Sequence, residues 1–180
     1  SWRGLSHLIS NSETGARLKI RVLAASQKEV QDDLDKAVEF DQSRLFKLLY
    51  EEEYGTFGGN PYSCLLADFE FGRHPQDIAL LEKLSNVAAA AHAPMIAAAS
   101  PKMFDLQSYT RLGAPRDLAK VFESSELIKW NSFRATEDSR YVSLVLPHIL
   151  MRLPYGPDTK PVDGFNFVEE VDGRDHQKYL

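Results

Sequence analysis

The chain has 180 residues, of which 43% are hydrophobic, and its formal net charge is −5. A chain of this length and composition can bury a full core, which excludes a wholly disordered protein. The acidic balance argues against non-specific binding to nucleic acid or to anionic membranes. No stretch of about 18 apolar residues is present that would span a membrane. We therefore expect a globular protein whose partners are neither nucleic acid nor membrane.

The sequence contains one cysteine, Cys64, so no internal disulfide is expected. It lies in an apolar run between Tyr62 and Leu66. A lone cysteine in such a run is typical of a packed thiol in a protein from a reducing compartment. We expect a protein from a reducing compartment with a buried, inert Cys64.

The first third of the chain predicts three helices and one strand. Apolar residues recur at helical spacing over 2–9. Residues 17–23 place Leu18, Ile20 and Val22 on one face in strict alternation, which is the period of a half-buried strand. Ser26 is followed three residues later by Glu29, the spacing of a capping box that opens a helix. A further helix is predicted over residues 43–53.

The middle of the chain predicts a βαβ unit. Residues 62–71 read as a strand that is apolar on both faces, as in a sheet covered on both sides. Pro75 and Asp77 open a helix that ends near His92, and residues 95–99 form a short buried strand. A strand, a helix and a strand in this order predict a crossover connection. The expected fold class is therefore α/β, a mixed sheet with helices on both faces.

The last part of the chain predicts short helices, one more strand and an arm. Residues 141–146 are β-branched and aromatic, which favours a strand. Residues 155–180 are rich in Gly, Pro and Asp, and Phe165, Phe167 and Val168 are the only apolar anchors there. We therefore divide the chain into an α/β domain over 1–154 and an extended arm or insertion over 155–180. Short helices are predicted at 105–109, 116–122 and 126–133.

One set of residues suggests an enzyme. Asp68 and Glu70 share a strand face, and His74 follows at the next helix start. Paired carboxylates can hold Mg²⁺, as in metal-dependent hydrolases and nucleases. No downstream lysine or histidine completes the set, so a solvated strand end is the simpler interpretation. A small metal-dependent hydrolase or nuclease is kept as the alternative function, and a free-standing flavodoxin-like binding module as a second.

Other patterns argue against a nucleotide-binding, zinc-binding or catalytic serine site. The glycine-rich residues 55–60 precede a strand, whereas a dinucleotide fingerprint follows one. The five histidines show no pair at i, i+4 and no cysteine partner, which argues against zinc. There is no Gly-x-Ser-x-Gly elbow for a nucleophilic serine. We expect no catalytic residues, no cofactor and no metal.

Three stretches resemble a known family along the length of the chain. They are residues 46–62 (FKLLYEEEYGTFGGNPY), residues 84–101 (LSNVAAAAHAPMIAAASP), and residues 137–156, which contain EDSRY and RLPYG. Together they resemble the large sheath subunit of bacterial type VI secretion systems. Motifs of this length seldom recur by chance.

The resemblance implies a structural role. Members of the family pair with a small sheath subunit, and the heterodimers stack with further sheath subunits into a helical cylinder around an inner tube protein. Contraction of that cylinder ejects the tube, and an AAA+ ATPase disassembles the contracted sheath. The fold would resemble a domain of contractile tail sheath proteins.

The resemblance also sets expectations about this chain. It would be the N-terminal and middle part of a longer protein, without the N-terminal segment associated with the ATPase and without the C-terminal half. The charged, aromatic and glycine-containing stretch from 51 to 59 is the candidate contact between subunits or domains. The residues assigned to it are Glu51, Glu52, Glu53, Tyr54 and Phe57.

Overall fold

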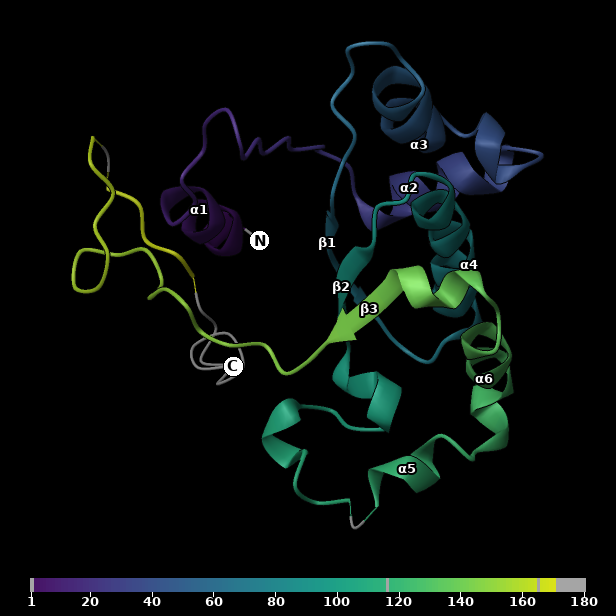
Figure 1. Cartoon of the computed structure of the whole chain (residues 1–180). Coiled ribbons are helices and arrows are strands. Elements are labelled where there is room, and N and C mark those ends of the chain that lie inside the picture. Colours follow the sequence, from purple (N-terminus) through teal and green to yellow (C-terminus); the bar gives the residue numbers. More distant parts are fainter. Residues whose placement is uncertain (1, 116, 165, 171–180) are drawn as a thin grey trace. The chain divides into compact units, whose positions relative to one another are not determined.

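The computed structural model describes residues 2–115, 117–164 and 166–170 (Figure 1). The chain forms two compact units. Unit 1 is drawn from Ser1–Ala24, Ser108–Thr110 and Pro147–Leu180, and unit 2 from Ala25–Gln107 and Arg111–Leu146. Phe165 and residues 171–180 of the predicted arm lie outside the described residues, as does Arg116. The boundary at residue 154 stays a prediction.

The centre of unit 2 is a three-stranded sheet. Its strands are β1 (Leu65–Phe71), β2 (Met95–Ala99) and β3 (Val142–Val145), in the order β1-β2-β3 (Figure 1). Both strand pairs are parallel. Helix α4 (Pro75–Ala90) connects β1 to β2, so the predicted βαβ unit and the α/β class are confirmed.

The register between β1 and β2 is interrupted inside β1. Ala67 pairs with Ala97, but the next paired residue, Glu70, pairs with Ala98. Asp68 and Phe69 are therefore extra residues in a bulge. Such a bulge bends its strand locally and changes the direction of nearby side chains.

Helix α4 carries the core of unit 2. The imidazole Nδ1 of His74 accepts a hydrogen bond from the N–H of Gln76 at 3.3 Å, and Pro75 occupies the first turn, where its missing N–H costs nothing. The helix contacts β1, β3 and α2. Small residues such as Ala88 and Ala97 lie in the core and allow close packing. Its buried side chains are Ile78, Leu80, Leu81, Leu84, Ser85, Val87 and Ala88.

Helix α2 (Gln27–Lys36) confirms the predicted capping box. Ser26 Oγ accepts from the N–H of Glu29 at 3.2 Å, and a Glu29 carboxylate oxygen accepts from the N–H of Ser26 at 2.8 Å. The hydrogen bond from the Ser26 backbone, followed by that from its side chain, lowers the pKa of Glu29 below its ordinary value of 4.5. Farther along α2, Asp33 caps a second helix, because its carboxylate accepts from the N–H groups of Arg44 and Leu45.

The remaining helices of unit 2 are short. α3 (Arg44–Phe46) continues without a break into a π-helix, Lys47–Tyr54. α5 spans Leu118–Val121 and α6 spans Ile128–Arg134, close to two of the predicted short helices. The helix predicted at 105–109 is not formed, and short 3₁₀ turns lie on either side of it instead. Among the described residues, no helix combines the length and the apolar character that crossing a membrane would require.

Two predictions about strands are wrong. Residues 17–23 form irregular chain, with Leu18 and Val22 exposed, because a strand also needs a neighbour to hydrogen-bond with, whatever its side-chain pattern. The face of β1 that carries Leu66 is not covered as predicted, since the Leu66 side chain is 61% exposed.

Cys64 lies just before β1 and is exposed, so it is not the buried thiol that its apolar neighbours suggested.

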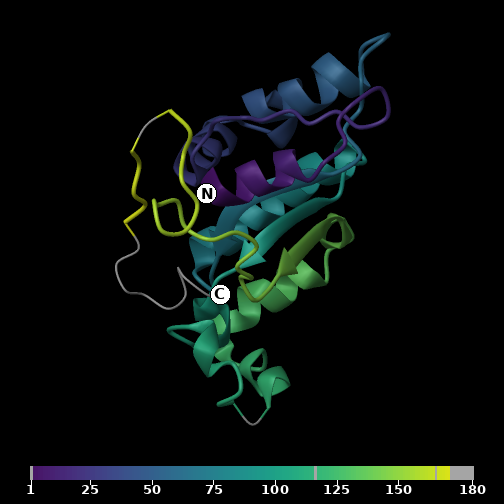
Figure 2. The same cartoon turned by 90° about the vertical axis from the view of Figure 1, so that its left-hand side faces the viewer.

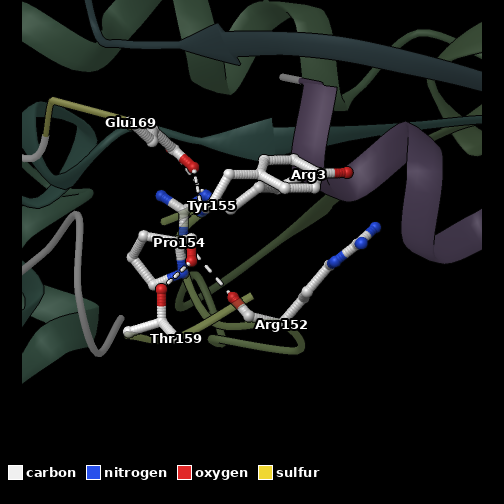
Figure 3. A network of polar contacts seen from close by, with 6 residues as sticks. All are labelled: Arg3, Arg152, Pro154, Tyr155, Thr159 and Glu169. Atoms are coloured by element: carbon white, nitrogen blue, oxygen red, sulfur yellow. Dashed lines mark hydrogen bonds and ion pairs between the residues drawn. The ribbon is translucent and has the colours of Figure 1, made fainter. Parts of the chain in front are cut away.

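In unit 1, a polar network joins helix α1 (Trp2–Ser10) to Arg152, Tyr155 and Glu169 (Figure 3). Arg3 Nε lies 2.8 Å from a carboxylate oxygen of Glu169, and the other Glu169 oxygen accepts from the N–H of Tyr155 at 3.1 Å. The guanidinium of Arg152 donates to Ser6 and stacks 4.4 Å from the centre of the Tyr155 ring. The first described residues of the predicted arm are therefore ordered around α1.

Candidate interaction surface

The segment that the sequence singled out begins with an unusual helix. The eight residues Lys47–Tyr54 form a π-helix, which ends where the N–H of Gly55 donates to the carbonyl of Tyr50 at 2.7 Å. π-Helical segments are rare and occur frequently at functional sites. This geometry is the first structural reason to regard the segment as specialised.

Stacked aromatic rings support one side of this helix. The ring centroids of Phe46 and Tyr50 lie 5.0 Å apart, and those of Tyr50 and Tyr54 lie 5.2 Å apart. His92, which ends the βαβ helix in a left-handed conformation at φ 51°, lies 5.6 Å from Tyr54. Phe40 packs edge-on against Phe46 at the inner end. The row leads from the core to the surface, so it holds the exposed end of the helix in place.

The loop after the helix is held closed by its own polar contacts. The N–H of Asn60 donates to a carboxylate oxygen of Glu53 at 2.8 Å, and Thr56 Oγ1 donates to the carbonyl of Glu51 at 2.5 Å. A Cβ on Gly59 would lie 2.1 Å from the carbonyl oxygen of Glu53, so only glycine fits this close approach. Gly58 adopts φ +81°, which also favours glycine. Residues 55–60 therefore form a pre-shaped loop, called here the Phe57 loop.

The structure divides the five predicted contact residues into two groups. Glu51, Glu52 and Tyr54 are exposed, and Phe57 is fully exposed at the loop. Glu53 differs from these four residues, because it is only 9% exposed and turns inward to the Asn60 N–H. A buried carboxylate is stable only when it is hydrogen-bonded, and the returning loop provides that bond. Glu53 thus shapes the surface that the other four residues present.

The candidate hydrolase residues Asp68, Glu70 and His74 do not form a metal site in the described part of the chain. Asp68 and Glu70 are both exposed on β1, but Asp68 lies in the bulge that interrupts the register. His74 uses Nδ1 to cap α4. Among the described residues, no group of three or more His, Cys, Asp or Glu side chains is placed to hold a metal ion. The geometry gives the hydrolase or nuclease interpretation no support.

Two histidines lie at the ends of α4. His74 caps the start of the helix, and His92 lies exposed at its end. The glycine-rich loop precedes β1 and opens no helix, so it does not have the geometry of a dinucleotide-binding turn.

Comparison with known proteins decides the family. The family model described as "EvpB/VC_A0108, tail sheath N-terminal domain" matches residues 1–180. This chain belongs to that tail sheath family. The resemblance drawn from residues 46–62, 84–101 and 137–156 is thereby confirmed.

A curated relative agrees with this assignment. The type VI secretion system sheath protein TssC1 of Pseudomonas aeruginosa strain PAO1 is 50% identical over 181 residues. The aligned region covers 99% of this chain and 36% of that protein, so the chain spans about a third of the length of its relative. The activity and partners of the whole protein that contains this chain are therefore proposed below.

Sequence reasoning missed a second surface feature of unit 2. A pocket of about 250 Å³ lies between α6 and β3. Trp130 and Phe133 are three residues apart on α6 and their rings lie 5.8 Å apart, so helical spacing alone would have placed them together. The contribution of β3 was not visible, because it depends on how the sheet and helix pack. The lining residues are Trp130, Phe133, Arg134, Ser139, Val142 and Leu144.

Proposed function

We propose that the protein containing this chain is a structural subunit of a type VI secretion contractile sheath. It pairs with a small sheath subunit, and the pairs assemble around an inner tube protein in the bacterial cytoplasm. Contraction of the assembly ejects the tube, and an AAA+ ATPase disassembles the contracted sheath. The observation that carries the proposal is the family match along the whole chain together with 50% identity to a named sheath protein.

The proposed role requires stiff contact surfaces and no catalytic group. Contraction moves subunits as rigid bodies, so it depends on interfaces that keep their shape while they shift. The π-helix and the Phe57 loop meet that need, since aromatic stacking and internal hydrogen bonds hold both of them. We accordingly propose a non-enzymatic protein without cofactor or metal.

The contact surface that we propose consists of Glu51, Glu52, Tyr54 and Phe57, with Glu53 as its internal support. Interface centres favour exposed aromatic residues, and the carboxylates around them give orientation and selectivity through charge. Both properties are combined here within one turn of helix and one loop.

The first test is co-expression of the full-length protein with the small sheath subunit of the same gene cluster. Co-elution in size-exclusion chromatography and tubes visible by electron microscopy are the expected results. A folded full-length protein that neither co-elutes nor forms tubes would contradict the proposed function.

The contact surface is tested by charge reversal in the same system. The double variant Glu51→Lys/Glu52→Lys should assemble poorly while its circular dichroism spectrum stays unchanged. The matched control is Glu82→Lys/Glu123→Lys, which makes the same change in net charge at exposed residues elsewhere in unit 2. If both variants assemble equally well, residues 51 and 52 are not part of the interface.

A further inference from the structure

The pocket between α6 and β3, called here the Trp130 pocket, is suited to an aromatic side chain. Its volume is about 250 Å³, and Trp130, Phe133, Val142 and Leu144 supply apolar walls. An engineered apolar cavity of about 150 Å³ is large enough to bind benzene. The volume of the Trp130 pocket is therefore sufficient for a phenyl ring, in a pocket that is open to solvent and partly polar at Arg134 and Ser139.

Two polar groups of this pocket lack a counterpart within the described chain. The buried indole N–H of Trp130 finds no acceptor among the described residues. Arg134 is exposed and forms no ion pair with any described residue. The exposed positive charge of Arg134 beside the aromatic wall of the pocket favours an occupant with an aromatic ring and a carboxylate.

The Phe57 loop presents that combination. Phe57 is fully exposed, and Glu51 and Glu52 lie exposed on the helix that leads into the loop. The contacts of Glu53 and Gly59 hold the loop in one conformation before any partner arrives. Pre-ordering of this kind reduces the entropy lost on binding, and exposed aromatic side chains are typical interface anchors.

The two features belong to the same unit but lie apart in it. The loop after α3 lies at one end of unit 2, whereas α6 lies toward the other end in both views (Figures 1 and 2). Since Phe57 is fully exposed, its ring does not occupy the pocket of its own chain. If the loop and the pocket contact each other, they therefore belong to two copies of the chain.

We propose that the Phe57 loop of one copy inserts into the Trp130 pocket of a second copy. The Phe57 ring enters the pocket, and the carboxylates of Glu51 and Glu52 face the exposed guanidinium of Arg134. The two surfaces differ, so the contact is head-to-tail and leaves a free loop and a free pocket at the ends. Repetition of such a contact produces a ring or an open helical filament. The inference rests on the proposed sheath function and specifies one of its contacts.

Photo-crosslinking within assembled sheaths tests the contact directly. Phe57 is replaced by p-azidophenylalanine, which keeps the aromatic ring, in the full-length protein assembled with its small subunit. Isotopically heavy and light copies are mixed before assembly. The expected product joins residue 57 of one copy to a peptide containing Trp130 or Ser139 of the other. The control carries the same probe at Val38, an exposed residue of unit 2, and should not label that peptide.

Charge exchange provides an independent test in the same assembly. Glu51→Arg/Glu52→Arg should lower the sedimentable sheath fraction at least tenfold, and adding Arg134→Glu should restore at least half of it. Tubes that form normally but whose crosslinks avoid residues 130–144 would overturn this inference and leave the sheath function standing. A triple variant that assembles no better than the double variant would also overturn it. Failure of the wild-type protein to form tubes would count against the proposed function instead.

Discussion

The guanidinium of Arg3 lies 2.8 Å from the carboxylate of Glu169, which joins helix α1 to the far end of the described chain. The same carboxylate accepts from the N–H of Tyr155, and the N–H of Glu169 donates to the carbonyl of Tyr155 at 2.8 Å. Glu169 therefore binds Tyr155 through both its backbone and its side chain, and the same carboxylate fixes this segment to α1. The Gly-, Pro- and Asp-rich composition that predicted an extended arm or insertion did not reveal this contact.

The Arg3–Glu169 pair should contribute to the stability of unit 1. The side chains are 20% and 25% exposed, so solvent screens their attraction only in part. A double-mutant cycle with Arg3→Ala and Glu169→Gln should give a coupling free energy of about 1 kcal/mol in urea unfolding. The cycle Arg140→Ala with Glu137→Gln, an exposed pair three residues apart, serves as the control and should couple more weakly. If the effects of the two substitutions on the free energy of unfolding are strictly additive, the ion pair does not contribute to stability.

Gly59 should tolerate no side chain. A Cβ at this position would lie 2.1 Å from the carbonyl oxygen of Glu53, and the neighbouring atoms are backbone, which cannot rotate away. Gly59→Ala should therefore lower the free energy of unfolding by about 1–3 kcal/mol, the range for overpacking. Gly113→Ala is the matched control, since nothing lies within 4 Å of its added Cβ. A Gly59→Ala protein as stable as this control would contradict the close approach in the Phe57 loop.

The capping box of α2 predicts a pH dependence. The pKa of Glu29 is lowered in the folded chain by hydrogen bonds from Ser26, so the ionised form favours folding. That stabilisation is fully present above the ordinary pKa of 4.5 and is lost as the pH falls through the lower folded pKa. Glu29→Gln should be less stable than wild type at pH 7, and the difference should vanish in acid. A carboxyl titration by NMR that places Glu29 at or above 4.5 would contradict the capping geometry.

The contacts that could be predicted are those within a few residues of each other. Ser26 and Glu29 are three residues apart, so their spacing alone specifies the capping box. The βαβ unit could be predicted for a similar reason, since the pattern of apolar residues within each strand and helix indicates that element locally. Residues 17–23 have the period of a strand, but strand formation depends on a partner that no local pattern supplies.

The candidate surface was readable in outline and not in detail. Charge, aromatic residues and glycines marked residues 51–59, but the inward turn of Glu53 depends on the loop returning to place Asn60 beside it. The exposure of Cys64 depends on where β1 begins, which its apolar neighbours do not determine. The Trp130 pocket needs β3 to pack beside α6, a contact between separate elements. In each case the missing information is a tertiary contact.

The two sides of the sheet in unit 2 should respond differently to truncation. Leu81 on α4 is completely buried in the core, whereas Leu66 on β1 is 61% exposed. Leu81→Ala should lower the free energy of unfolding by about 2–5 kcal/mol, because it removes buried methyl groups and leaves a cavity. Leu66→Ala should change it by less than about 0.5 kcal/mol in this chain. Urea denaturation of both variants measures the contrast. A large loss at Leu66 in the isolated chain would show that this face of the sheet is covered and that the core of unit 2 extends to both sides.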